Sequence, residues 1–240
     1  MNNAQTTHCR RCGTCCEKGG PSLHHEDRPL VDRGDIPVRH LFTLRKGELA
    51  RDNVKGVLAP LREEIIKIKG QNGRWTCRYY DPRERGCRIY RHRPLECRVL
   101  NCQDTGPIEQ LYATGRLTRR DLLVKIQGLW ELVEDHEQRC SYTNLAVRVH
   151  AGDQEKGVLR QEQAILETLR YDAHIRQLTV EKAGLDAGML DFVFGRPLAK
   201  TIQMFGIELV RKNGVYGLAP VQTTEDRRRR ADIPHMSSEF

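Results

Sequence analysis

The chain has 240 residues, a formal net charge of +8 at pH 7, and 38% hydrophobic, 6% aromatic and 30% charged residues. This length suits one large domain, or a small domain with a helical extension, and the low apolar fraction supports only a modest core. No apolar stretch reaches the roughly 18 residues that a membrane span needs, and the first 20 residues contain no apolar signal region. We therefore expect a cytoplasmic protein without a membrane partner.

The first block of cysteines lies near the start of the chain, in the sequence C-R-R-C-G-T-C-C. The spacing of its first three cysteines is the one that bacterial ferredoxins use for three ligands of a four-iron cluster, whereas zinc sites more often use paired C-x2-C hooks. Clustered cysteines in a reducing compartment are typical of metal sites, and buried free thiols that pack as small apolar side chains are the alternative. The candidate ligands of this block are Cys9, Cys12, Cys15 and Cys16.

A second block of cysteines follows a stretch rich in turn signals, in which residues 58–69 are compatible with either a helix or a strand. We predict two short strands at 75–80 and 87–90, joined by a turn that brings two cysteines together, and a turn or short helix that Pro94 opens. The block has no C-x2-C pair, which favours an iron–sulfur cluster over a zinc ribbon. Its candidate ligands are Cys77, Cys87, Cys97 and Cys102, and Arg98 is the candidate for offsetting their negative charge.

Beyond residue 105 the apolar residues recur at helical spacing. The lone Cys140 in this region is not expected to be a ligand. We predict helices at 107–116, 118–138 and 154–182, an interrupted helix at 188–205 and a hairpin with an Asn-Gly turn at 207–218. The predicted fold class is α+β, with a small cysteine-rich metal-binding module at 1–104, a mainly α-helical region at 105–220 and a flexible basic tail at 221–240 that contains Arg227–Arg230.

The two cysteine blocks together resemble a known family, the YkgJ-like cysteine-cluster proteins, which are described as zinc- or iron-chelating. The first block has the CxxCxxCC pattern of this family, and the second block, C-R-I-Y-R-H-R-P-L-E-C-R, is similar to the family signature C-x-I-Y-x-x-R-P-x-x-C-R. The resemblance covers residues 8–102 and implies metal ligation by the cysteines of both blocks, with Cys102 the least certain of them. The flagellin lysine N-methylases are similar in this pattern and carry an iron–sulfur cluster, but shared cysteines do not transfer an activity.

These observations predict a metalloprotein whose cysteines hold an iron–sulfur cluster that serves redox chemistry, sensing or a protein-modification reaction, with an unidentified protein partner. The alternatives are a structural zinc module that binds protein or nucleic acid, and a metal chaperone. The basic charge gives weak support to a nucleic-acid partner. No residue is assigned a catalytic role, so whether the protein is an enzyme is undecided. Folding of the first module should depend on metal, because it has few apolar residues of its own.

Overall fold

The computed structural model describes residues 9, 11–152 and 158–221, and its N-terminal part consists of short strands and short helices. The strands pair antiparallel: β1 (Leu41–Leu44) with β4 (Ile65–Ile68), β2 (Leu49–Asp52) with β3 (Val57–Pro60), and β5 (Tyr80–Asp81) with β6 (Gly86–Cys87). The helices are α1 (Thr14–Glu17), α2 (Arg28–Asp32), α3 (Leu95–Val99) and α4 (Gly106–Leu111). Short 3-10 turns occur at His25–Asp27, Val38–His40 and Tyr90–His92.

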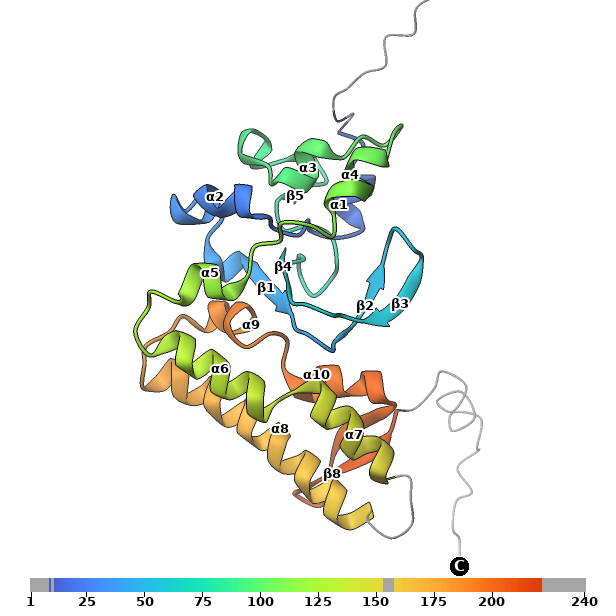
Figure 1. The fold of residues 1–240 in the computed structure, drawn as a ribbon, viewed down its shortest axis with the longest axis vertical. Helices are drawn as coiled ribbons and strands as arrows, with labels where there is room; N and C mark the ends of the chain where they lie inside the picture. The colour runs from blue at the N-terminus through green and yellow to red at the C-terminus, as the bar shows by residue number, and fades with distance from the viewer. Residues whose placement is uncertain (1–8, 10, 153–157, 222–240) are drawn as a thin grey trace, which may run out of the picture.

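The C-terminal part is mainly helical. Its longer helices are α5 (Arg119–Leu123), α6 (Leu129–Arg139), α7 (Tyr142–Gly152) and α8 (Val158–Glu181). They are followed by α9 (Leu190–Val193), α10 (Leu198–Thr201) and the hairpin of β7 (Ile207–Lys212) and β8 (Val215–Pro220), with 3-10 turns at Ala187–Met189 and Ile202–Phe205. Figure 1 shows α1, α3 and α4 grouped at one end of the molecule and α6, α7 and α8 at the other. Helices and small sheets together confirm the predicted α+β class.

Three local expectations are settled by backbone conformation and strand pairing. The continuous helix predicted at 118–138 is wrong, because Gly128 has a φ of 77° and this left-handed backbone separates α5 from α6. Residues 58–69, for which the sequence allowed a helix or a strand, contain strands. The isoleucines of β4 are buried, and β4 pairs with β1. The predicted Asn-Gly hairpin is confirmed, with positive φ angles of 50° at Asn213 and 81° at Gly214.

Other sequence expectations have mixed outcomes. The helix predicted at 107–116 is shorter, since α4 ends at Leu111. The predicted interruption near Gly195 is confirmed, because α9 ends at Val193 and the next helix begins at Leu198. The basic tail, including Arg227–Arg230, lies outside the described residues apart from position 221. No helix in the described part of the chain combines the length and the apolar character required to cross a membrane.

The largest hydrophobic core joins the two halves of the chain. It contains Leu23 and Ile66 from the N-terminal part and Phe192 and Phe194 from the C-terminal part, all fully buried. Figure 1 shows α9 between the β1–β4 sheet and α6. The Thr43 hydroxyl of β1 donates a hydrogen bond to the Phe192 carbonyl oxygen at 2.7 Å. The N-terminal half therefore obtains from α6 and α9 the apolar contacts that its own sequence lacks.

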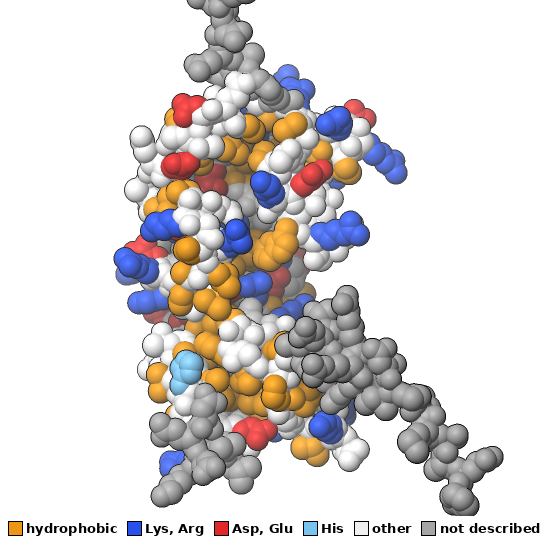
Figure 2. All heavy atoms as spheres, turned by 90° about the vertical axis from the view of Figure 1, so that its right-hand side faces the viewer, with side chains coloured by type: hydrophobic (Ala, Val, Ile, Leu, Met, Phe, Trp, Pro, Cys, Tyr) orange, Lys and Arg blue, Asp and Glu red, His pale blue; other side chains and the backbone are white. Residues whose placement is uncertain are grey.

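Hydrophobic side chains also gather on the face of the molecule that carries the β2–β3 hairpin (Figure 2). Val57 and Leu58 of β3 are 49% and 66% exposed, and Val54 in the turn is 44% exposed. This hairpin thus adds exposed apolar surface and contributes little to the core.

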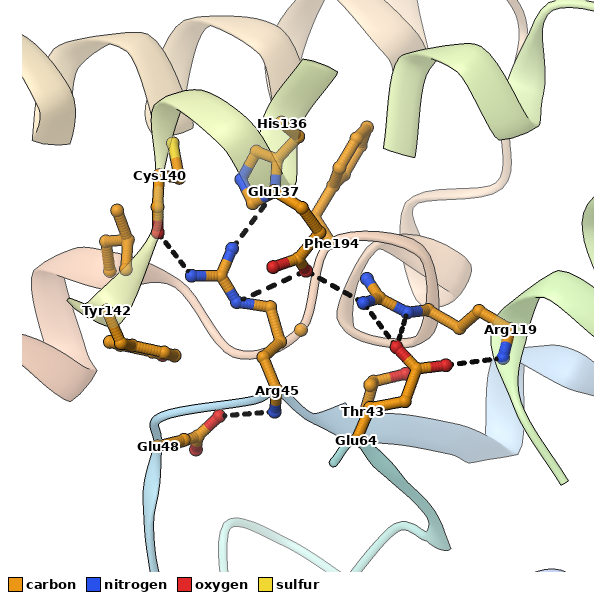
Figure 3. A network of polar contacts seen from close by, with 12 residues as sticks. Thr43, Arg45, Glu48, Glu64, Arg119, His136, Glu137, Cys140, Tyr142 and Phe194 are labelled. Atoms are coloured by element: carbon orange, nitrogen blue, oxygen red, sulfur yellow. Dashed lines mark hydrogen bonds and ion pairs between the residues drawn. The ribbon is translucent and has the colours of Figure 1, made fainter. Parts of the chain in front are cut away.

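A network of buried charges crosses the same junction between the two halves (Figure 3). Arg119, which is 2% exposed, donates to the Glu64 carboxylate through Nε at 2.8 Å and to the Glu137 carboxylate at 2.8 Å. The fully buried Arg45 donates to the Cys140 carbonyl oxygen at 2.6 Å. Since Arg45 follows β1 and Glu137 lies on α6, these ion pairs fix the sheet to the helices.

The network should make stability depend on acidity. Burial by itself would raise the pKa of Glu137, but the charges of Arg45 and Arg119 outweigh burial and hold this pKa below its ordinary value. A carboxyl group of this kind stabilises the fold fully above its unfolded pKa of about 4.3, and the stabilisation disappears as the pH falls through the lower folded pKa. We expect the melting temperature of the Glu137→Gln variant to fall less steeply below about pH 5 than that of the wild type. Equal losses on acidification in thermal melts would contradict this assignment.

Candidate metal centre

One cavity collects the thiols of both cysteine blocks. It has a volume of about 60 Å³, and tyrosine and arginine side chains complete its wall. Cys140 lies elsewhere, fully buried, with its sulfur 4.0 Å from the Thr168 carbonyl oxygen. The structure thus brings together every cysteine of the two blocks. The thiols on the cavity wall are those of Cys9, Cys12, Cys15, Cys16, Cys77, Cys87, Cys97 and Cys102.

The first block enters the cavity through a turn at Gly13 that begins α1. Gly13 has a φ of 85°, a left-handed conformation that glycine adopts readily. Cys15 and Cys16 are adjacent on α1, and their sulfur atoms are 3.9 Å apart. The backbone N–H of Cys77 donates to the Cys16 carbonyl oxygen at 2.7 Å. This hydrogen bond joins the first block directly to the second.

The second block enters through the β5–β6 hairpin and α3. Tyr80 of β5 lies opposite Cys87 of β6, whereas Cys77 precedes β5 and forms a bridge with Gly70. The strands are therefore shorter than the sequence predicts, because Cys77 pairs with an earlier loop instead of extending the hairpin. Cys97 lies on α3.

Two acidic side chains, one buried and one half-buried, fix α3, the helix that carries Cys97. Asp27, which is fully buried, accepts a hydrogen bond from the Leu95 backbone N–H at 2.7 Å. Glu96 accepts one from the Ser22 backbone N–H at 2.7 Å. The first bond satisfies an N–H group that has no partner within the helix. Sequence reasoning missed both contacts, because the partners lie 68 and 74 positions apart and no local spacing marks them.

The thiols differ in their exposure. Cys77 is buried, and the thiols of Cys9, Cys12 and Cys102 are exposed. The remaining four are half-buried. The cavity therefore has an inner side at Cys77 and an outer side at the three exposed cysteines, where solvent reaches the sulfur atoms.

The electrostatics of the thiols favour a bound cation. The hydrogen bond with Cys16 lowers the pKa of Cys15 to about 6 against the opposing effect of burial, and the Arg93 charge contributes. Burial raises the pKa of Cys97, and the charges of Cys77 and Cys15 raise it further. Several thiolates side by side are unfavourable without a positive partner. A metal ion would relieve this repulsion and would displace the thiol protons.

The spacing of the sulfur atoms limits what the cavity fits. Among the described residues, no three of these sulfur atoms lie within 4.8 Å of one another. Zn–S bonds of about 2.3 Å place the sulfur atoms around one tetrahedral zinc ion about 3.8 Å apart. The thiols are thus more widely spread, and more numerous, than the ligands of a single zinc ion. As soft donors, they suit metals such as zinc, copper(I) and the iron of iron–sulfur clusters.

Comparison with known proteins supports metal binding at this cavity. Residues 8–115 match the CxxCxxCC family model, described as a putative zinc- or iron-chelating domain. We refer to these residues below as the CxxCxxCC domain, after the family model that they match. The match contains both cysteine blocks and confirms the family resemblance of their sequences. No curated protein and no solved structure matches the chain.

The arginines that line the cavity of the CxxCxxCC domain do not include the one that the sequence predicted. Arg98 is not among the described residues that line the cavity, and its guanidinium lies 3.8 Å from the Asp27 carboxylate. Arg11, Arg85 and Arg93 line the cavity. The charge-offsetting role expected of Arg98 therefore fits Arg93 better.

A second set of side chains that could bind a metal ion lies outside the CxxCxxCC domain. His136, Cys140 and Asp172 are buried, and their ligand atoms lie within 4.8 Å of one another. Guanidinium groups already occupy this set: Arg45 lies 3.1 Å from the His136 Nδ1, and Arg176 lies 2.9 Å from the Asp172 carboxylate. A metal cation would be repelled by both, so we interpret the set as part of the polar core.

Replacing Gly13 with alanine is expected to displace the first cysteine block of the CxxCxxCC domain. The alanine Cβ would lie 2.1 Å from the Tyr80 hydroxyl oxygen, and Tyr80 is buried and not free to move aside. We expect metal affinity to fall roughly tenfold to a hundredfold, the range for residues that orient ligands. Chelator competition measures this change.

The matched control for this variant is Gly34→Ala. Gly34 has a similar φ of 78°, but no atom lies within 4 Å of the added Cβ. Both variants therefore carry the backbone strain, and Gly13→Ala alone carries the clash. Equal metal affinities of the two variants would show that the Gly13 turn does not position the cysteines.

Proposed function

We propose that the CxxCxxCC domain of this protein holds an iron–sulfur cluster that serves redox chemistry, sensing or a protein-modification reaction. The observation that carries this proposal is the wide spread of the thiols, since no three of the described sulfur atoms lie within 4.8 Å of one another. A single zinc ion would hold its sulfur ligands closer together. The ferredoxin-like spacing of the first three cysteines supports the same conclusion. When bound, such a cluster supplies one-electron transfer.

Both blocks contribute residues that would hold the cluster. Cys9, Cys12 and Cys15 supply the ferredoxin-like triple, and the second block supplies the further ligands, with Cys97 on the fixed helix α3. The buried Tyr79 of the cavity wall keeps water from the inner side. The thiols beyond the first four suffice for a second centre. Because all of the cysteines are free, we propose a reducing, cytoplasmic location.

Two zinc ions in a structural module are the second candidate, favoured by the number of thiols. Eight thiolates suit two tetrahedral four-thiolate sites. The domain would then present a surface to a protein partner. Base stacking of a nucleic acid has less support, because Tyr79 and Tyr80 are buried and the Tyr90 ring has guanidinium groups of Arg11 and Arg93 over it.

The test is the metal and acid-labile sulfide content of the anaerobically purified full-length protein, with electron paramagnetic resonance spectra before and after reduction. Iron with matching sulfide and a signal that changes on reduction is the expected result. Stoichiometric zinc without sulfide would overturn the iron–sulfur proposal and would favour the structural module.

A further inference from the structure

A stack of three side chains lies at the cavity and joins the two cysteine blocks. The guanidinium carbon of Arg93 is 3.7 Å from the centre of the Tyr90 ring, and that of Arg11 is 4.3 Å from it. Tyr90 and Arg93 belong to the second block, whereas Arg11 lies between Cys9 and Cys12 of the first. All three stacked residues line the cavity. The stack therefore connects segments that are about eighty residues apart in the sequence.

The inner half of the stack is fixed by the backbone. Arg93 donates a hydrogen bond through Nε to the Tyr90 carbonyl oxygen at 3.0 Å, so its guanidinium and the ring are held together. Arg93 is half-buried, whereas Arg11 is exposed. The ring thus presents a fixed surface against which the exposed Arg11 side chain packs.

Arg11, which forms the outer layer of the stack, has an unusual backbone conformation. Arg11 has a φ of 55°, in the left-handed region that residues with a Cβ rarely adopt. Its backbone N–H is directed at the Cys9 sulfur, 3.4 Å away. Such a conformation persists only where surrounding contacts hold it. The contact with Tyr90 is one that holds this loop and so sets the position of its exposed thiols.

We propose that Tyr90 is a positioning residue that, through its stack with Arg11 and Arg93, holds Arg11 and the neighbouring thiols of Cys9 and Cys12 at the cavity wall. Its purpose as part of a metal centre rests on the proposed function, while the positioning itself does not. Two cation–π contacts of ordinary strength correspond to roughly a five- to thirtyfold change in how often these thiols leave the cavity wall.

The test measures the alkylation rates of individual cysteines by N-ethylmaleimide in the full-length protein as purified, read by peptide mass spectrometry. We expect Tyr90→Ala to raise the rates at Cys9 and Cys12 by roughly five- to thirtyfold. Tyr90→Phe keeps the aromatic face and is expected to react at the wild-type rate. The rate at the fully buried Cys140 reports global unfolding and is expected to stay unchanged.

Two further variants keep the test decisive. Arg11→Gln removes only the exposed layer of the stack, so it should raise the same two rates even if Tyr90→Ala disturbs folding. Tyr216→Ala removes a comparable arginine–tyrosine contact, with Arg211 5.6 Å from the ring, in the distant β7–β8 hairpin, and should change neither rate. Wild-type rates in Arg11→Gln, or fast rates in Tyr90→Phe, would overturn the proposal. Because the rates are compared whether or not metal is found, failure of the positioning role is distinct from failure of the iron–sulfur proposal.

Discussion

Replacing Cys97 with serine is expected to remove most of the metal from the CxxCxxCC domain. Cys97 is held on α3 by buried contacts, and the charges of Cys77 and Cys15 act on it. A serine oxygen is a harder and poorer donor for zinc or iron than a thiolate. If four thiolates share a binding free energy of about 10–16 kcal/mol, losing one weakens binding by about 3 kcal/mol, or roughly a hundredfold. Metal content after chelator competition measures this loss.

The control for this variant is Cys140→Ser. Cys140 is fully buried but does not line the cavity, so its replacement should leave the metal content unchanged. That the first module needs metal to fold stays a prediction, and the core that it shares with α6 and α9 argues against it. We expect Cys97→Ser to keep its main thermal transition while losing metal. Full metal retention in Cys97→Ser would exclude this thiol from the centre.

Replacing Arg119 with methionine is expected to give the largest loss of stability among single changes outside the cavity. The side chain is 2% exposed, and its removal leaves the carboxylates of Glu64 and Glu137 without their main partner. Breaking a buried pair on one side lowers the free energy of unfolding by about 3–5 kcal/mol. For a chain of this length, this corresponds to a melting temperature roughly 10 °C lower. Chemical and thermal denaturation measure the change.

The matched control is Arg139→Met. Arg139 pairs with Asp135 at 2.8 Å, but both side chains are exposed, at 61% and 40%. Such a surface pair contributes at most about 1 kcal/mol. The double variant Arg119→Met with Glu64→Gln should recover part of the lost stability, because it removes one unpaired buried charge. Equal stability of Arg119→Met and Arg139→Met would show that the network does not hold the two halves together.

Much of the candidate site was predictable from local sequence. The short spacings of the first block keep Cys9, Cys12 and Cys15 close together whatever the rest of the chain does. The second block was predicted as a hairpin and a short helix, and both elements occur. The exact register was not predictable, because Cys77 pairs with Gly70 and this contact depends on a loop outside the motif.

The role of charge could be assigned only in three dimensions. Several arginines flank the second block, and adjacency in sequence favoured Arg98. In the structure Arg98 faces Asp27, while Arg93 faces the thiols. Neighbouring residues on a short helix point in different directions, so proximity along the chain does not indicate which side chain reaches the cavity.

The two cysteine blocks of metal-binding type and the α+β class follow from local patterns in the chain, because ligand chemistry and short spacings are local properties. The tertiary structure brings all eight thiols to one cavity and completes the core of the N-terminal half with α6 and α9. It also decided that Arg45 and Arg119 are buried at this junction and that Tyr90 contacts the first cysteine loop. Such contacts join residues far apart in the chain, and they form only when packing brings those residues together.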